Sequence, residues 1–309
     1  MKVNLMSGWI RALLPFALAI AACSVPGGLG HELQSATSVE PSPTTRPQST
    51  SPATATLSRT PTSLTASPTW TSLPTLPPAS ALDRVERLMA GSPDCLLPCW
   101  WAITVGVTPW LEAEHLLATY STEIRHWSTT TVEEPDGPHT LASYYVYYQT
   151  RDGDGGMAVG TRDGIVDYIF TNTDSTSRDM SAHDVVDKYG IPTLALVRTV
   201  DEVTQGGFPF WLAFFYDRNS FLVVYEFEAH RSGGDVVGCP ATIPPKLHVW
   251  SAAEPWTMDK IQVAVLGVDP STPLKDISEV SDYSLETLYA AFIAQGEDLC
   301  LRTPASVWE

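Results

Sequence analysis

The chain has 309 residues, a formal net charge of −17 at pH 7 and 25 prolines. From residue 81 onward it carries 14 basic and 33 acidic residues, which is a net charge of −19. This stretch is long enough to bury a substantial core, and with no basic stripe to displace phosphate counterions the sequence excludes nucleic acid as a partner.

The N-terminus has the layout of an export signal. Lys2 and Arg11 precede a run of mainly apolar residues over 12–22. The run ends in Ala21-Ala22 and is followed by Cys23. The run is shorter than the ~20 residues that a membrane-spanning helix needs. It resembles the signal peptide and lipobox of bacterial lipoproteins, which implies cleavage before Cys23, a lipid on its thiol and a position on the outer face of the cell membrane. The alternative is an ordinary cleaved signal, or an N-terminal membrane anchor, with a chance cysteine.

Residues 24–80 have the composition of a disordered tether. Of these 57 residues, 33 are Ser, Thr or Pro, and the apolar residues are scattered singly. Such a segment cannot bury enough apolar surface to offset the loss of chain entropy. We therefore expect a signal peptide over 1–22, and a lipidated cysteine with a disordered linker of roughly 40 Å as a flexible coil over 23–80.

The remaining chain is predicted to be α+β, beginning near Ala81. A helix is predicted from Thr108-Pro109, strands over 141–149, 157–161 and 165–171, a helix over 181–190, and strands over 194–198, 208–216 and 221–228. The order of helix then antiparallel sheet occurs twice, which predicts two such units over 81–235 and indicates duplication of one module. The C-terminal segment over 236–309 is expected to pack on the same domain, with a short strand over 247–250, a helix or a strand over 257–266, and a helix after Ser284.

Short patterns in the domain resemble two groups of proteins. Ile103-Thr-Val-Gly106-Val-Thr108 and the stretch from Ser181 to Pro192 are similar to the entrance and the helix with Gly-x-Pro exit of lipoprotein modules in outer-membrane assembly factors of the SmpA/OmlA type. These modules, like the similar β-lactamase-inhibitor-protein fold, imply protein binding without catalytic residues. The first unit lacks the exit and the second lacks the entrance. The stretches over 95–103 and 300–308, behind the tether, resemble the domain ends of a group of uncharacterised bacterial lipoproteins.

Four cysteines remain after lipidation: Cys95, Cys99, Cys239 and Cys300. An even number in an exported chain predicts two disulfides, with three possible connectivities. We favour Cys95 with Cys99, because Pro98 can shape a tight loop, and Cys239 with Cys300, which would fasten the C-terminal segment. A zinc site made by all four thiolates is the alternative, but neither pair has Cys-x-x-Cys spacing.

The domain contains no hydrolase elbow, zinc-protease, phosphate-loop or dinucleotide motif. The sequence therefore predicts no catalytic residue, metal or cofactor. Glu226 and Glu228 alternate on one predicted strand, so their carboxyl groups face the same way roughly 7 Å apart, which suits an inverting glycosidase. Their alternation with Tyr225 and Phe227 is typical of any half-exposed strand, and we favour this interpretation.

Aromatic residues are the candidate binding surface. Trp100-Trp101 directly follows Cys99, and Tyr145 and Tyr147 share one face of a predicted strand. Exposed rings beside acidic groups can stack on sugars or contact a protein. For the two tryptophans the alternative, which we favour, is that both rings cover the core beneath the Cys95–Cys99 loop. We expect a lipid-anchored, non-enzymatic binding domain for a protein or glycan ligand. The alternative is a cell-wall carbohydrate-binding protein or glycoside hydrolase that uses the exposed aromatics and Glu226/Glu228.

Overall fold

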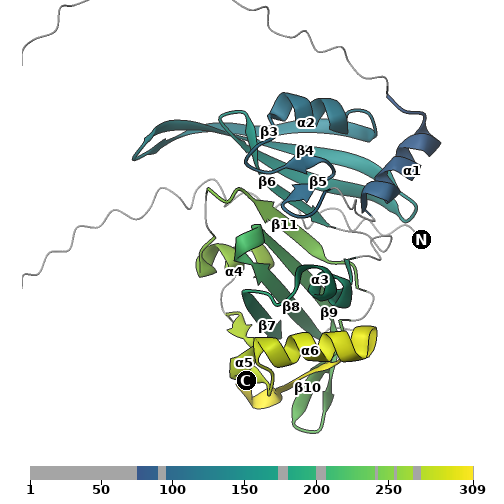
Figure 1. The fold of residues 1–309 in the computed structure, drawn as a ribbon, viewed down its shortest axis with the longest axis vertical. Helices are drawn as coiled ribbons and strands as arrows, with labels where there is room; N and C mark the ends of the chain where they lie inside the picture. The colour runs from purple at the N-terminus through teal and green to yellow at the C-terminus, as the bar shows by residue number, and fades with distance from the viewer. Residues whose placement is uncertain are drawn as a thin grey trace, which may run out of the picture. The chain divides into compact units, whose positions relative to one another are not determined.

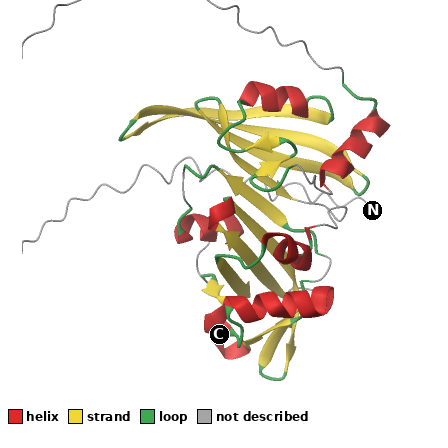
Figure 2. Cartoon of the chain, in the orientation of Figure 1, coloured by secondary structure: helices red, strands yellow, loops and turns green. Residues whose placement is uncertain are grey.

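The computed structural model describes residues 75–89, 95–172, 180–199, 207–240, 243–253, 256–266 and 273–308. They form a mixed α+β fold around one large antiparallel sheet (Figure 1), as Figure 2 shows by element type. The predicted signal peptide, Cys23 and most of the predicted linker lie outside the described residues. The first described helix begins at Pro78, three positions before the predicted start of the domain at Ala81.

The sheet has the strand order β12-β7-β8-β9-β11-β6-β5-β4-β3, with every neighbouring pair antiparallel. The bounds are β3 Ser121–Glu134, β4 Gly137–Thr150, β5 Gly153–Arg162, β6 Ile165–Asn172, β7 Leu194–Thr199, β8 Phe208–Tyr216, β9 Phe221–Ser232, β11 Lys246–Trp250 and β12 Lys275–Asp276. Two short strands, β10 Asp235–Gly238 and β13 Leu301–Pro304, pair beside the end of β9.

Helices cover both faces of this sheet. Their bounds are α1 Pro78–Met89, α2 Trp110–Leu117, α3 Ala182–Tyr189, α4 Met258–Leu266, α5 Ile277–Val280 and α6 Leu285–Gln295. Apolar residues of α1, α2, α3 and α6 share one buried cluster with the strands, whereas Ile261 and Val265 of α4 pack on Leu222 and Val224 in a second cluster. Because side chains alternate along a strand, the second cluster lies on the opposite face, which we call the α4 face.

Side-chain caps set the starts of two predicted helices. The Ser181 side chain accepts a hydrogen bond from the backbone N–H of Asp184 at the start of α3. Ser284 and Thr287 form a reciprocal capping box at the start of α6. Each cap satisfies backbone donors that the first helical turn leaves without a partner, and such caps are typically worth ~1 kcal/mol. Residues 257–266, for which the sequence allowed either a helix or a strand, contain helix α4.

The two predicted α+β units share one continuous sheet. The first contributes α2 and β3 to β6, and the second contributes α3 and β7 to β9. Strand β11 from the C-terminal segment lies between them, pairing with β6 on one side and β9 on the other. The C-terminal segment therefore supplies the strand that joins the two units.

The first unit also contains a long strand that the sequence patterns missed. β3 pairs with β4 as far as Glu134 opposite Gly137, whereas the pairing of β4 with β5 stops at Leu141 opposite Arg162. Residues 131–140 thus form a two-stranded ribbon beyond the end of β5, which we call the arm (Figure 1).

Both disulfides have the favoured connectivity. Cys95 is bonded to Cys99 and Cys239 to Cys300, with sequence separations of 4 and 61 residues. On the chain-entropy model the longer loop is worth ~4 kcal/mol and the shorter ~2 kcal/mol. The longer bridge ties β13 and the preceding helix α6 to the chain that follows β10.

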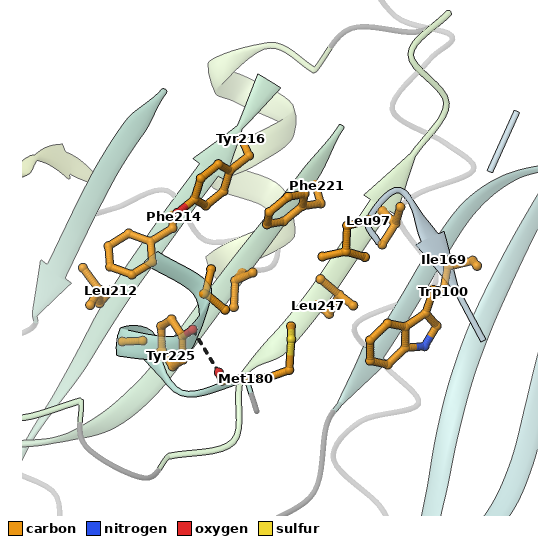
Figure 3. Close-up of a cluster of buried hydrophobic side chains, with 14 of the residues drawn as sticks. Leu97, Trp100, Ile169, Met180, Leu212, Phe214, Tyr216, Phe221, Tyr225 and Leu247 are labelled. Carbon is orange, nitrogen blue, oxygen red and sulfur yellow. Dashed lines mark hydrogen bonds between the residues drawn. The ribbon is translucent and has the colours of Figure 1, made fainter. Parts of the chain in front are cut away.

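Trp100 and Trp101 are buried, with 5% and 2% of their surface exposed. The expectation that this pair forms an outward platform is therefore wrong. A small hairpin of β1 Cys99–Trp100 and β2 Ile103–Thr104 directs both rings to the core, where Trp101 contacts Tyr148 edge to face at 4.8 Å between centroids. Figure 3 shows Trp100 in the same buried cluster as Ile169.

We predict that Trp101→Ala lowers the free energy of unfolding by ~3–5 kcal/mol, because it removes a buried aromatic ring and leaves a cavity. Leu111→Ala, at a side chain that is 66% exposed, is the control and should change stability by less than ~0.5 kcal/mol. Urea denaturation followed by circular dichroism measures both. Equal stabilities of the two variants would contradict the burial of Trp101.

Candidate functional site

A pocket of about 450 Å³ opens over β8, β9 and the chain that enters β11. It is lined by Pro209, Val224, Glu226, Phe227, Glu228, Ile243, Pro244 and Lys246. The lining combines apolar side chains with three charged groups. A site of this composition suits a ligand that has both an apolar part and a charge.

The alternation of β9 places both glutamates in this pocket. Tyr225 and Phe227 are buried on the core side, whereas Glu226 and Glu228 are exposed on the other side. Residues two apart on a strand have side chains roughly 7 Å from one another. The shared orientation expected from the sequence is therefore present, and the two carboxylates lie within one cavity.

The two carboxylates differ in their partners. Lys246 Nζ donates a hydrogen bond to Glu226 Oε2 at 2.5 Å. In the part of the chain that the structure describes, no ion pair involves Glu228. One of the two negative charges is thus balanced within the protein, and the pocket keeps a net negative charge at Glu228.

An aromatic side chain lies next to the pocket. Trp211 of β8 is directly opposite Glu226 of β9 in the strand register and is half-buried. The Arg198 guanidinium lies over the Trp211 ring, 5.2 Å from its centroid. The cation occupies one face of this ring, which is then not open to a ligand.

Tyr145 and Tyr147 are half-buried neighbours on one face of β4. Their ring centroids are 4.6 Å apart, and the Arg125 guanidinium lies 5.4 Å from the centroid of Tyr147. Glu123 accepts hydrogen bonds from Arg125 at 2.9 and 3.1 Å. A Cβ at Gly156 would lie 2.5 Å from the Tyr145 hydroxyl, so a side chain there would displace the ring from β5. Burial raises the pKa of Tyr145.

The sheet divides the predicted aromatic surface into two parts. Trp101 packs on Tyr148, which points to the face of the sheet that α1, α2, α3 and α6 cover. The tyrosine pair points to the α4 face, because the strand register runs directly across the sheet through Tyr145, Ala158, Phe170, His248 and Leu222. The tyrosine pair and the pocket therefore share one face of the sheet, without Trp100 or Trp101.

His248 lies between these two features and is structural. It is buried, and its Nδ1 is 2.7 Å from the Tyr168 hydroxyl. Burial lowers the pKa of His248 to about 3, so the imidazole is neutral at physiological pH. It contacts the rings of Phe170 and Trp256 in the packing of the α4 face.

A charged cluster that sequence patterns missed connects the arm to the turn between β5 and β6. His139 Nδ1 is 2.7 Å from Asp163 Oδ2 and His139 Nε2 is 3.0 Å from Asp136 Oδ1. Arg162 Nη1 lies 3.0 Å from both carboxylate oxygens of Glu134. We call these five residues the clasp, since they tie the arm to the turn between β5 and β6.

The clasp also contains the donor types of a metal site. Ligand atoms of Glu134, Asp136 and His139 lie within 4.8 Å of one another. Each of these atoms already has a partner, because both imidazole nitrogens face carboxylates and Arg162 binds Glu134 through both oxygens. The arrangement therefore functions as an ion-pair network.

Comparison of the chain with protein-family models, curated proteins and solved structures finds no match. Among the described residues, no helix combines the length and the apolar character needed to span a membrane. The geometry of the pocket, the tyrosine pair and the arm is therefore the basis for functional inference.

We predict that the pKa of His139 lies above its ordinary value of 6.5, because the hydrogen bond to Asp163, followed by that to Asp136, favours the imidazolium. Asp163→Asn should lower it, whereas Asp282→Asn, an exposed control outside the clasp, should not. NMR titration of the imidazole measures this shift.

The sign of the accompanying stability change is fixed by linkage. The contribution of His139 is fully present below pH 6.5 and is lost as the pH rises through the raised pKa. The same hydrogen bonds lower the pKa of Asp136 and Asp163, so their contribution is present above pH 3.8 and is lost as the pH falls through the lowered values. A His139 pKa at or below 6.5 would contradict the clasp.

Proposed function

We propose that this protein is a lipid-anchored, extracytoplasmic binding domain without enzymatic activity, and that the pocket over β8, β9 and β11 binds a positively charged group of its ligand. The observation that carries the proposal is the pairing within this pocket: Lys246 balances Glu226, while Glu228 keeps its charge beside an apolar wall. An ammonium or guanidinium on an apolar stem matches this combination of groups.

The charge of the whole domain supports a cationic ligand. The net charge of −19 over residues 81–309 produces a negative potential that raises the local concentration of cations and speeds their association. An ion pair made by an exposed carboxylate contributes ~0.2–1 kcal/mol, which corresponds to an affinity gain of up to roughly five-fold. Exposed carboxylates are screened by salt, so binding should weaken as ionic strength rises.

A wall-associated glycoside hydrolase is the second candidate. Its support is the presence of Glu226 and Glu228 in one cavity at a spacing suited to an inverting pair. Against it, the Trp100 and Trp101 rings that would stack on a sugar are buried, and Arg198 occupies one face of the Trp211 ring. A binding role needs only the charges and the apolar wall, so it requires fewer groups than hydrolysis.

We predict that Glu228→Gln weakens binding of a cationic probe by roughly two-fold to five-fold. The probes are synthetic peptides that each carry one lysine or arginine beside apolar residues, and the measurement is calorimetric titration of the full chain in detergent. Glu112→Gln removes the same charge from an exposed helix position away from the pocket and should leave the affinity unchanged.

Two outcomes would overturn this assignment of the pocket. One is equal affinity of wild type and Glu228→Gln for every cationic peptide that binds. The other is hydrolysis of wall polysaccharide by the wild type that is lost in both Glu226→Gln and Glu228→Gln, because this result would establish the second candidate. A glycan array on the same three proteins detects sugar binding without hydrolysis.

The anchor is tested separately. We predict that a palmitate analogue labels the protein in cells and that Cys23→Ser abolishes the label, because the lipobox-like sequence makes the Cys23 thiol the acylated group. The variant should also leave the membrane fraction. Persistence of both the label and the membrane association in Cys23→Ser would contradict lipid anchoring and leave the pocket assignment untouched.

A further inference from the structure

β3 is an unusually long edge strand with an open side. It extends over 14 residues and pairs with β4 on one side, and no other strand of the described residues pairs with it. Most of its side chains are exposed. Unpaired N–H and C=O groups along an edge form a template for another strand, and native proteins usually shorten, cover or charge such edges. At the opposite edge, β12 has only two residues.

The outer part of β3 is suited to pairing. The register with β4 is irregular between His126 and Ser128 and then regular through Glu134. The regular stretch reads Ser-Thr-Thr-Thr-Val-Glu-Glu, rich in β-branched residues and free of lysine and proline. The clasp ties the arm to the β5–β6 turn, which restricts the motion of this edge before a partner binds.

We propose that the occupant of this edge is β3 of a second copy, paired antiparallel about a two-fold axis through Thr131. In an antiparallel pair, two residues that lie directly opposite each other either both point their N–H and C=O groups toward the partner strand or both point them away. These directions alternate along a strand, so the numbers of two opposed residues differ by an even amount. The two-fold axis of a symmetric pair therefore passes through a residue. Thr131 is the centre of the regular stretch from Ser128 to Glu134. This register therefore uses every regular residue and stops before the bulge.

The sequence is complementary to itself in this register. Glu134 lies opposite Ser128 of the second copy, Glu133 opposite Thr129, and Thr130 opposite Val132. The two Glu133 carboxylates are offset by four residues along the strands, or roughly 13 Å, which exceeds the Debye length of ~8 Å at physiological salt. No like charges are opposed, so the acidic character of the chain does not prevent this pairing.

Trp127 lies just before the paired stretch and is 49% exposed. It stands at the irregularity between His126 and Ser128, so the register centred on Thr131 does not extend to it. Anchoring to a membrane, as in the proposed function, would raise the local concentration of the protein and so favour the dimer. The pairing itself depends only on β3.

Cysteine crosslinking tests the register in the full chain. Thr131→Cys places two thiols directly opposite each other at the axis, so mild oxidation in native membranes should give a covalent dimer. Thr129→Cys is the matched control, since it changes the same residue type on the same strand face but leaves the thiols offset by roughly 13 Å. The expected result is efficient crosslinking for the first variant and little for the second.

Charge substitution tests the same contact without a covalent bond. Thr131→Lys opposes two ammonium groups at the axis and should convert the detergent-purified dimer to monomer in sedimentation analysis. Thr129→Lys opposes each ammonium to Glu133 of the second copy and should preserve the dimer. A monomeric wild type, a dimer that survives Thr131→Lys, or equal crosslinking at positions 129 and 131 would each overturn the proposal.

Discussion

The architecture depends on the pairing of β11 on both of its sides. This five-residue strand hydrogen-bonds to β6 and to β9, and Leu247 and Val249 are fully buried on the core side. Without it the two α+β units would each have an open sheet edge in the middle of the molecule. Such edges are costly because their backbone groups lose their partners and their apolar faces are exposed. The disulfide between Cys239 and Cys300 encloses the segment that contains β11.

The pocket is a consequence of this arrangement. Lys246 is the first residue of β11, and its ammonium reaches Glu226 only because β11 lies beside β9. The opposite face of β9 is committed to the core, where the Tyr225 hydroxyl donates to the Met180 carbonyl (Figure 3). Strict alternation therefore gives β9 one face that packs in the core and one face that carries the two glutamates of the pocket.

Local sequence patterns were sufficient to predict the elements in which the apolar periodicity agrees with the capping and turn residues at the ends. The helix from Ala182 has a serine cap and a following glycine, and β8 was predicted with its observed bounds. β3 was missed because its side chains are mostly polar on both faces, so it has no apolar alternation to detect. The tryptophan pair was ambiguous for a related reason: a short hairpin directs neighbouring rings toward the core, and no periodicity over two residues encodes that direction.

The amino-acid sequence by itself determined the α+β class, most helices and strands, the acidic charge and the orientation of Glu226 with Glu228, because each depends on local spacing or composition. It favoured the observed disulfide connectivity among three possibilities, and the tertiary structure decided it. Tertiary structure decided which of these features meet. The insertion of β11 between distant strands brought Lys246 to Glu226, and the β5–β6 turn brought Asp163 to His139. Such contacts join residues separated by 20 and 24 positions, and they form only after the chain has paired across the sheet. The sheet register, which no local pattern specifies, therefore determines the candidate site.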